Sequence, residues 1–217
     1  MNSLTAMRLE KFTGKNMAKK FGSFLLLIMA VLLSGIAGML CLGGINSYAR
    51  DNLDDASGCV FIIPPDYVPS DESGVFKNKS YPMESSSISY SVYYNGKDKV
   101  MTNREAAEYK ASGRADIVDE SLNLTKEIYE SNMIAAYNKE YSENVDFSVN
   151  SFDKITVDGY PGFKIVSEYK PSDTEKIHQT VYMIISKYRT FTISFQRADD
   201  DDCQEIFEKS AATIHIK

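Results

Sequence analysis

Residues 154–166 read KITVDGYPGFKIV and carry the clearest structural signal in the chain. Within them, Asp158-Gly159 is a two-residue turn signal, because both residues tolerate the positive φ angles of a tight hairpin. Apolar residues flank the turn on both sides, at Ile155, Val157, Phe163 and Ile165. This pattern predicts two antiparallel strands joined by a hairpin.

The rest of the C-terminal half continues the strand pattern. Apolar residues recur at alternate positions before the hairpin and in two later segments, at Phe147, Val149, Ile177, Val181, Met183, Ile185, Phe191, Ile193 and Phe195. After the acidic run Asp199–Asp202 we expect a short helix with Ile206 and Phe207 on its inner side, and then a last strand over residues 213–216. Strands joined by short turns predict an antiparallel sheet.

Upstream, two segments have contrasting patterns. Residues 59–63 form a short apolar run that ends at Pro64-Pro65, and this predicts a buried strand because proline cannot continue a ladder. Residues 66–83 contain Pro69, Gly74 and Pro82, a composition typical of a loop.

The middle of the chain predicts one strand and two helices. Residues 87–94 alternate between a hydroxyl-rich face and an apolar face, and Asn95-Gly96 after them predicts a second hairpin that returns over residues 100–101. A short helix is expected over 102–113 and a longer one over 120–141, with Asp119 as its cap. An antiparallel sheet covered by helices is an α+β fold.

Residues 24–42 form an apolar run without a charge, which follows five basic residues and the single acid Glu10. About 20 apolar residues span a bilayer, and a basic flank is typical of the cytoplasmic side. We therefore expect residues 1–49 to be a signal peptide or membrane anchor. Residues 50–58 would then be a polar linker, and residues 59–217 a single domain on the extracytoplasmic side.

Three fates of the N-terminal segment are open. Ser47 and Ala49 place small side chains where signal peptidase requires them, so we favour cleavage after Ala49. An uncleaved segment would anchor the protein in the membrane. The third possibility is a lipid on Cys41, but Met39 and Leu40 fit a lipid-attachment motif poorly, which favours an ordinary apolar cysteine.

The charge of the chain excludes one class of partner. Residues 1–49 hold five basic residues and one acid, so the remaining 168 residues hold 19 basic and 29 acidic residues and carry a net charge of −10. Such a surface repels phosphate backbones and anionic lipid headgroups. We expect no nucleic-acid partner.

Cys59 and Cys203 are the two cysteines of the expected domain. In an oxidising compartment such a pair is a disulfide candidate. The aspartates before Cys203 disfavour a thiolate, so a reactive nucleophile is not expected there. A disulfide and two buried thiols both remain open.

The sequence contains no recognisable catalytic motif. Its only histidines, His178 and His215, lie in strand patterns, and no glycine-rich phosphate loop, paired-cysteine metal site or zinc-protease helix is present. We expect a protein that is not an enzyme and has no cofactor. The alternative is an extracellular hydrolase with a non-standard site.

Two binding sites are conceivable. Asp199, Asp200 and Asp202 are a calcium candidate because carboxylate oxygens suit this ion, although a solvated helix N-terminus is the favoured interpretation. Residues 85–94 with the loop 66–83 are a second candidate if that strand lies at a sheet edge, where its backbone can accept a partner strand. An internal strand with a solvated serine face is the favoured interpretation there.

Several segments of the sequence resemble those of PsbP-like domains. They are the opening strand 59–63, the turn over residues 157–165, the two strands within 182–195, the helix around Phe207 and the ending 214–216. The resemblance implies a non-catalytic α/β/α sandwich with a central antiparallel sheet, of the bacterial secreted or envelope type. It brings no ligand residues with it. The expected function is a membrane-proximal binding domain with a protein or cell-envelope partner, secreted or anchored outside the membrane.

Overall fold

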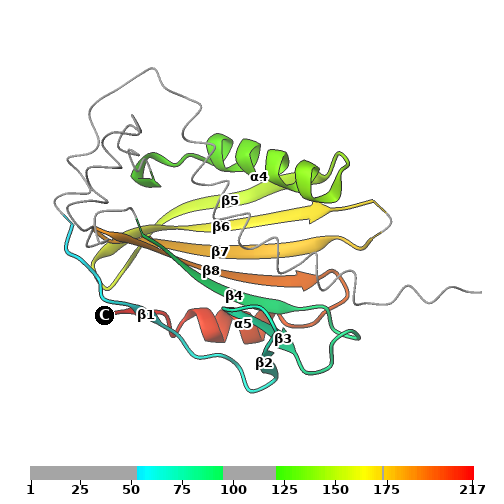
Figure 1. The fold of residues 1–217 in the computed structure, drawn as a ribbon, viewed down its shortest axis with the longest axis horizontal. Helices are drawn as coiled ribbons and strands as arrows, with labels where there is room; N and C mark the ends of the chain where they lie inside the picture. Colours follow the sequence, from blue (N-terminus) through cyan, green and yellow to red (C-terminus); the bar gives the residue numbers. More distant parts are fainter. Residues whose placement is uncertain (1–52, 95–120, 173) are drawn as a thin grey trace, which may run out of the picture.

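The computed structural model describes residues 53–94, 121–172 and 174–217, which are built around an antiparallel sheet (Figure 1). Seven strands lie in the order β2-β3-β4-β8-β7-β6-β5, and each is antiparallel to its neighbours. Their bounds are β2 Tyr67–Pro69, β3 Val75–Asn78, β4 Ser87–Tyr94, β5 Asp146–Val157, β6 Tyr160–Lys170, β7 Ile177–Ile185 and β8 Arg189–Ala198. A separate pair joins β1 (Cys59–Val60) to β9 (His215–Ile216).

The hairpin predicted at Asp158-Gly159 is confirmed. Asp158 has φ +50° and Gly159 has φ +87°, as the mirror-image turn of a two-residue hairpin requires. From Val157↔Tyr160 the register runs along the whole of β5 and β6, with one bulge between Val149 and Ser151.

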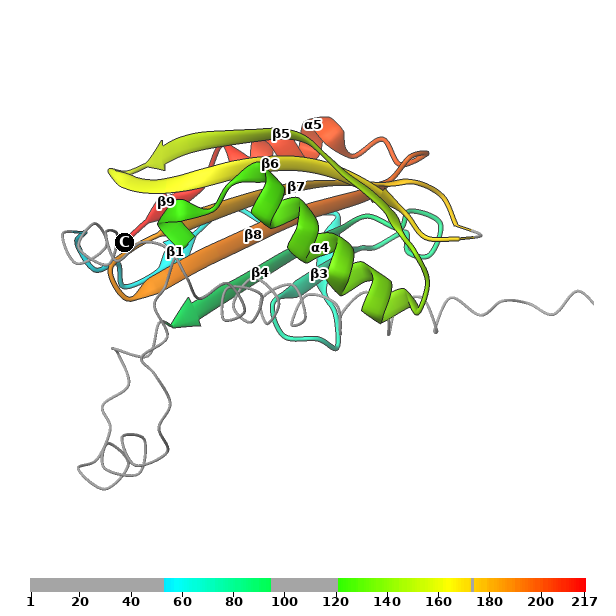
Figure 2. The same cartoon turned by 90° about the horizontal axis from the view of Figure 1, so that it is seen from above.

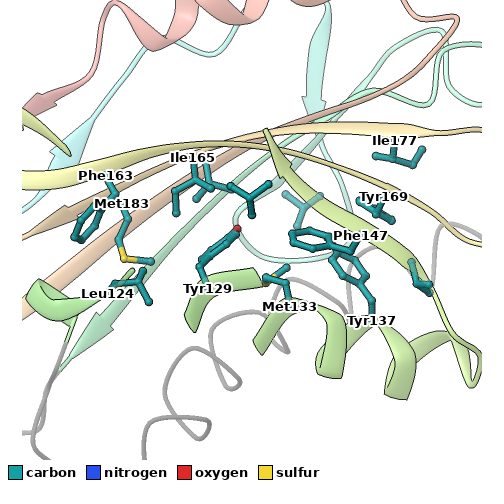
Figure 3. Packing of buried hydrophobic residues seen from close by; sticks show 14 of the residues in the cluster. Leu124, Tyr129, Met133, Tyr137, Phe147, Phe163, Ile165, Tyr169, Ile177 and Met183 are labelled. Atoms are coloured by element: carbon teal, nitrogen blue, oxygen red, sulfur yellow. The ribbon is translucent and has the colours of Figure 1, made fainter. Parts of the chain in front are cut away.

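The helix α4 (Lys126–Tyr141) covers one face of the sheet, and Figure 2 shows it crossing over the strands. Its buried residues Tyr129, Met133, Ala136 and Tyr137 form the stripe that the sequence predicts. Figure 3 shows Tyr129, Met133 and Tyr137 directed at residues of the sheet such as Phe147 and Ile165.

The predicted start of this helix is wrong. Residues 121–123 form a short 3₁₀ turn, and the α-helix begins only at Lys126. Thr125 decides the start because its Oγ1 accepts a hydrogen bond from the Ile128 N–H at 3.3 Å. Asp119, the predicted cap, lies outside the described residues.

The helix α5 (Gln204–Ala211) lies on the opposite face (Figure 1), where it contributes to a second apolar cluster. The centre of the Phe207 ring lies 5.2 Å from that of the Phe195 ring of β8 and 5.7 Å from that of the Tyr67 ring of β2. Ile214, just before β9, joins the same cluster. The described part of the chain is therefore mostly antiparallel sheet with two helices, which confirms the predicted α+β class.

Two predictions for residues 59–83 need correction. Residues 66–83 are not a loop, because β2 and β3 form a hairpin beside β4. Residues 59–63 are not a fully buried strand, since β1 ends at Val60 and Ile62 is 64% exposed. The backbone of Ile62 instead bonds to the side chains of Thr213 and Ser210 at 2.8 and 2.6 Å, which takes it out of any ladder.

Several expectations lie outside the described residues: the segment 1–49 with its cleavage site at Ala49, the Asn95-Gly96 turn with its returning strand, and the helix over 102–113. In the parts of the chain that are described, no helix has the length and apolar character needed to cross a bilayer.

Candidate functional site

The candidate site is a row of polar side chains on β4 and β8, which we call the hydroxyl face. Its members are Ser87, Ser89 and Ser91 of β4 and Thr190, Thr192, Ser194 and Gln196 of β8. Alternate residues of a strand share one side, and the register sets Ser87 opposite Gln196, Ser89 opposite Ser194 and Ser91 opposite Thr192. The row therefore runs along two adjacent strands on one face of the sheet.

The hydroxyl face lies on the same side of the sheet as α4. Ser194 is opposite Val181 of β7, and Val181 is opposite Ile165 of β6. Val181 and Ile165 both belong to the apolar cluster that α4 covers. One side of the sheet thus changes from apolar on β5–β7 to polar on β8 and β4.

The hydroxyl face is buried, which contradicts the prediction of a solvated serine face. Thr192 is 3% exposed and Ser194 is 2% exposed. The other part of that interpretation is confirmed, because β4 lies inside the sheet between β3 and β8. Within the described residues, β3 pairs with Ser87–Ser89 at the start of β4, and the Tyr90 N–H donates to the Gly74 carbonyl next to them at 2.8 Å. Strand periodicity shows which residues share a face, but it does not show what covers that face.

Several buried polar atoms at this face have no hydrogen-bond partner. They are Ser91 Oγ, Thr192 Oγ1 and Ser194 Oγ, together with Gln179 Nε2 of the adjacent strand β7. The absence of partners refers to the residues that the structure describes. Gln179 uses its Oε1, which accepts a hydrogen bond from the Ser167 hydroxyl at 3.3 Å. A buried polar atom without a partner costs about 1–3 kcal/mol, so such atoms usually bond to water or a ligand.

Thr192→Val is therefore expected to raise the free energy of unfolding by about 1 kcal/mol, because it removes an unpartnered buried hydroxyl and keeps the volume of the side chain. Urea denaturation followed by circular dichroism measures the change. Thr180→Val is the matched control, since Thr180 lies on β7 opposite Phe195, on the other face of the sheet. A loss of stability in Thr192→Val alone would show that this hydroxyl is bonded.

The aspartate run does not converge on one point. Asp199 Oδ1 lies 2.6 Å from His178 Nε2, which holds the pKa of this carboxyl below its usual value. Asp201 turns inward, where burial raises its pKa and its Oδ2 accepts the Ala198 N–H at 3.4 Å. Asp200 lies close enough to Glu175 to raise the pKa of that carboxyl, and Asp202 is exposed.

The calcium candidate thus gains no geometric support from Asp199, Asp200 and Asp202. Among the described residues, no group of three or more His, Cys, Asp or Glu side chains is arranged to hold a metal ion. The favoured interpretation, in which the aspartates form a solvated helix N-terminus, also changes in detail. The helix α5 begins at Gln204, so the aspartates precede its first turn.

The two histidines are paired with carboxylates. His178 also lies 3.8 Å from Glu168, whose nearer partner is Lys176 at 2.8 Å. His215 Nδ1 lies 3.3 Å from Asp158 Oδ2 at the surface. Among the described residues, the hydrogen bonds of both histidine rings go to aspartates and none goes to a serine, threonine or cysteine side chain.

Cys59 and Cys203 are both free and buried, so the alternative of two thiols describes this structure. Cys203 Sγ donates to Ser86 Oγ at 3.3 Å, and the Tyr67 hydroxyl donates to the same oxygen at 2.8 Å. Cys59 lies on β1, where burial, followed by the charge of Asp158, raises its pKa to about 11.

The raised pKa of Cys59 predicts slow alkylation of the folded protein at pH 8, because the thiolate is the reactive form. Since the folded state holds this proton more tightly than the unfolded state, stability is also expected to fall as the pH rises from about 9 to about 11. Iodoacetamide labelling read by mass spectrometry tests the first expectation, with urea-unfolded protein as the control. Equal labelling rates in both states would contradict it.

The fold is similar to that of cyanobacterial PsbP from Synechocystis sp. PCC 6803, with a TM-score of 0.51 and 15% sequence identity over 83% of this chain and 99% of that chain. Two other solved structures match less well. A protein from Bacteroides thetaiotaomicron has a TM-score of 0.36 and 13% identity, over 73% of this chain and 45% of that one. A protein of unknown function from Pseudomonas aeruginosa has a TM-score of 0.31 and 8% identity, over 74% and 83%.

No family model matches the sequence, and no curated protein matches it. An identity of 15% shows the fold alone. The predicted resemblance is therefore confirmed as a PsbP-like fold.

Proposed function

We propose that this chain is a PsbP-like domain of the secreted or envelope type, an α/β/α sandwich over residues 59–217 that acts outside the membrane. In this proposal it binds a partner there and catalyses no reaction. Residues 1–49 bring it to that place, either as a cleaved signal peptide or as a permanent anchor.

The hydroxyl face is the observation that carries the binding role. Ordinary sheet cores are apolar, and a buried polar group is costly unless something bonds to it. Here Thr192 and Ser194 keep such groups at alternate positions of β8, on one face of the sheet, with their hydrogen-bonding capacity unused. A ligand that makes hydrogen bonds to these groups would offset the free-energy cost of burying them. The arrangement is therefore what a binding site for a polar ligand requires.

The extracytoplasmic location is supported by residues 24–42, an uncharged apolar run behind a basic flank. The net charge of −10 after residue 49 is compatible with a soluble domain held near the membrane, because acidic surfaces do not adhere to anionic headgroups.

Alkaline phosphatase fused after Lys217 is expected to be active in bacterial cells, since this reporter folds only outside the cytoplasm. Deletion of residues 24–42 should abolish that activity. N-terminal sequencing of the exported chain then separates cleavage, which leaves Arg50 first, from an uncleaved anchor. An inactive full-length fusion would contradict the proposed location.

The binding role is tested with the same tagged chain, used as bait on solubilised cell envelopes. A component retained by the native chain and lost in the double variant Thr192→Val, Ser194→Ala is the expected result. Retention by both chains would place the binding surface elsewhere.

A further inference from the structure

We propose that the hydroxyl face is a binding site for a neutral polyhydroxylated ligand, a saccharide of one or two rings. This inference rests on the proposed binding function and names the chemical class of its ligand.

The unpartnered atoms are neighbours in the register. Ser91 and Thr192 stand directly opposite each other, and Ser194 follows Thr192 on the same side of β8. Gln179 is opposite Gln196, the next residue of the row after Ser194. Strands lie about 4.8 Å apart and alternate residues about 7 Å apart, so Ser91, Thr192 and Ser194 lie within about 8 Å of one another, whereas Gln179 lies about 14 Å further along the strands from Thr192. A ligand of one or two rings can reach the three hydroxyls together.

The chemistry of the row excludes a charged ligand. Every member of the hydroxyl face is uncharged, and an ion buried there would lack a counter-charge. Among the described residues, the register sets one charged side chain beside the row, that of Lys77 opposite Ser87, and its Nζ lies over the Tyr81 ring at 5.2 Å. Lys77 shares its register row with Gln196 and Gln179 and lies about 14 Å along the strands from Ser91 and Thr192.

An apolar ligand does not fit either, because it would leave the same atoms unfilled. Hydroxyls of Ser91, Thr192 and Ser194 each donate and accept, whereas Gln179 Nε2 only donates. A ligand hydroxyl has the same dual capacity as the protein hydroxyls and supplies acceptors for the amide. Neutral polyols and saccharides present many such groups in a small volume.

The row is less covered toward one end of β4, since Ser87 and Ser89 are 9% and 7% exposed whereas Ser91 and Tyr93 are half-buried. On β8 the residues opposite them, Thr192 and Thr190, stay buried. Tyr93 lies on the same face, opposite Thr190. The Tyr93 ring beside these hydroxyls provides an apolar plane for sugar C–H groups. The chain contains no tryptophan, so a tyrosine ring takes this role here. The ligand would approach from this end.

The test titrates the full chain, held in a detergent without a sugar headgroup, with glucose, N-acetylglucosamine and the β-1,4-linked dimer of each. Binding is measured by saturation-transfer NMR and by calorimetry. At least one of these probes should bind, and Thr192→Val should weaken it by about tenfold, because one hydrogen bond to the ligand is lost. Thr180→Val, on the other face of the sheet, should bind the probe like the native chain.

Two results would overturn the inference. The first is that none of the four probes binds to the folded native chain. The second is that a probe binds equally well to the native chain and to Thr192→Val. Both leave the proposed function standing if the phosphatase fusion is active and the envelope component is still retained. Conversely, an inactive fusion would remove the proposed location without touching saccharide binding measured in detergent.

Discussion

Gly162→Ala is expected to lower the free energy of unfolding by about 3 kcal/mol. A Cβ at this position would lie 2.2 Å from the Met183 carbonyl oxygen and 3.1 Å from Ile184 Cα. Both atoms belong to the backbone of β7, which is held on one side by β6 and on the other by β8. A flexible side chain would move aside, but this strand cannot shift without disturbing two ladders.

Gly58→Ala is the matched control for this substitution. A Cβ added at Gly58 meets nothing within 4 Å, and Gly58 has no positive φ. Its effect is expected to stay within about 0.5 kcal/mol of zero. Urea denaturation of both variants, followed by circular dichroism, gives the comparison. If Gly162→Ala were as stable as Gly58→Ala, this would contradict the claim that the backbone of β7 leaves no room for a Cβ at Gly162.

Tyr129→Ala is expected to lower the free energy of unfolding by about 4 kcal/mol, because it empties a large part of the cluster under α4. Tyr129 has no exposed surface, and its ring centre lies 6.4 Å from those of both Phe147 and Phe152 of β5. Figure 3 shows the Tyr129 ring on the side of α4 that faces the sheet. The cavity would separate α4 from the edge strand that it covers. Thermal unfolding and urea denaturation both report the loss.

Tyr129→Phe separates the ring from its hydroxyl. In the described part of the molecule the Tyr129 hydroxyl is buried without a partner, and this burial raises its pKa. Phenylalanine keeps the ring and removes the unpartnered oxygen, so it should be at least as stable as the native chain. A loss close to that of Tyr129→Ala would show that the hydroxyl, and not the ring, anchors the helix.

Local chemistry made parts of the fold predictable. Asp158-Gly159 specifies its hairpin because a two-residue turn needs two positive φ angles, and both residues accept them. The buried stripe of α4 followed from helical periodicity in the same way. The start of α4 did not, because a residue caps a helix only where the chain presents its side chain to the first N–H groups, as Thr125 does.

The β2–β3 hairpin was missed for a different reason. Tyr67–Pro69 and Val75–Asn78 are too short to show a period, and Pro69 and Gly74 signal a loop. These residues are strands because β4 offers a ladder beside them and the two apolar clusters bury Tyr67 and Val75. Neighbours distant in sequence supply that stabilisation.

By itself, the sequence determined the α+β class, the hairpin at Asp158-Gly159 and the two-faced character of residues 87–94, because each depends on short-range periodicity or on turn chemistry. Only the tertiary structure decided that β4 lies between β3 and β8, that its serines meet Thr192 and Ser194, and that this polar row is buried. The order of strands and the burial of a face depend on contacts between segments about 100 residues apart, and no local pattern encodes those contacts.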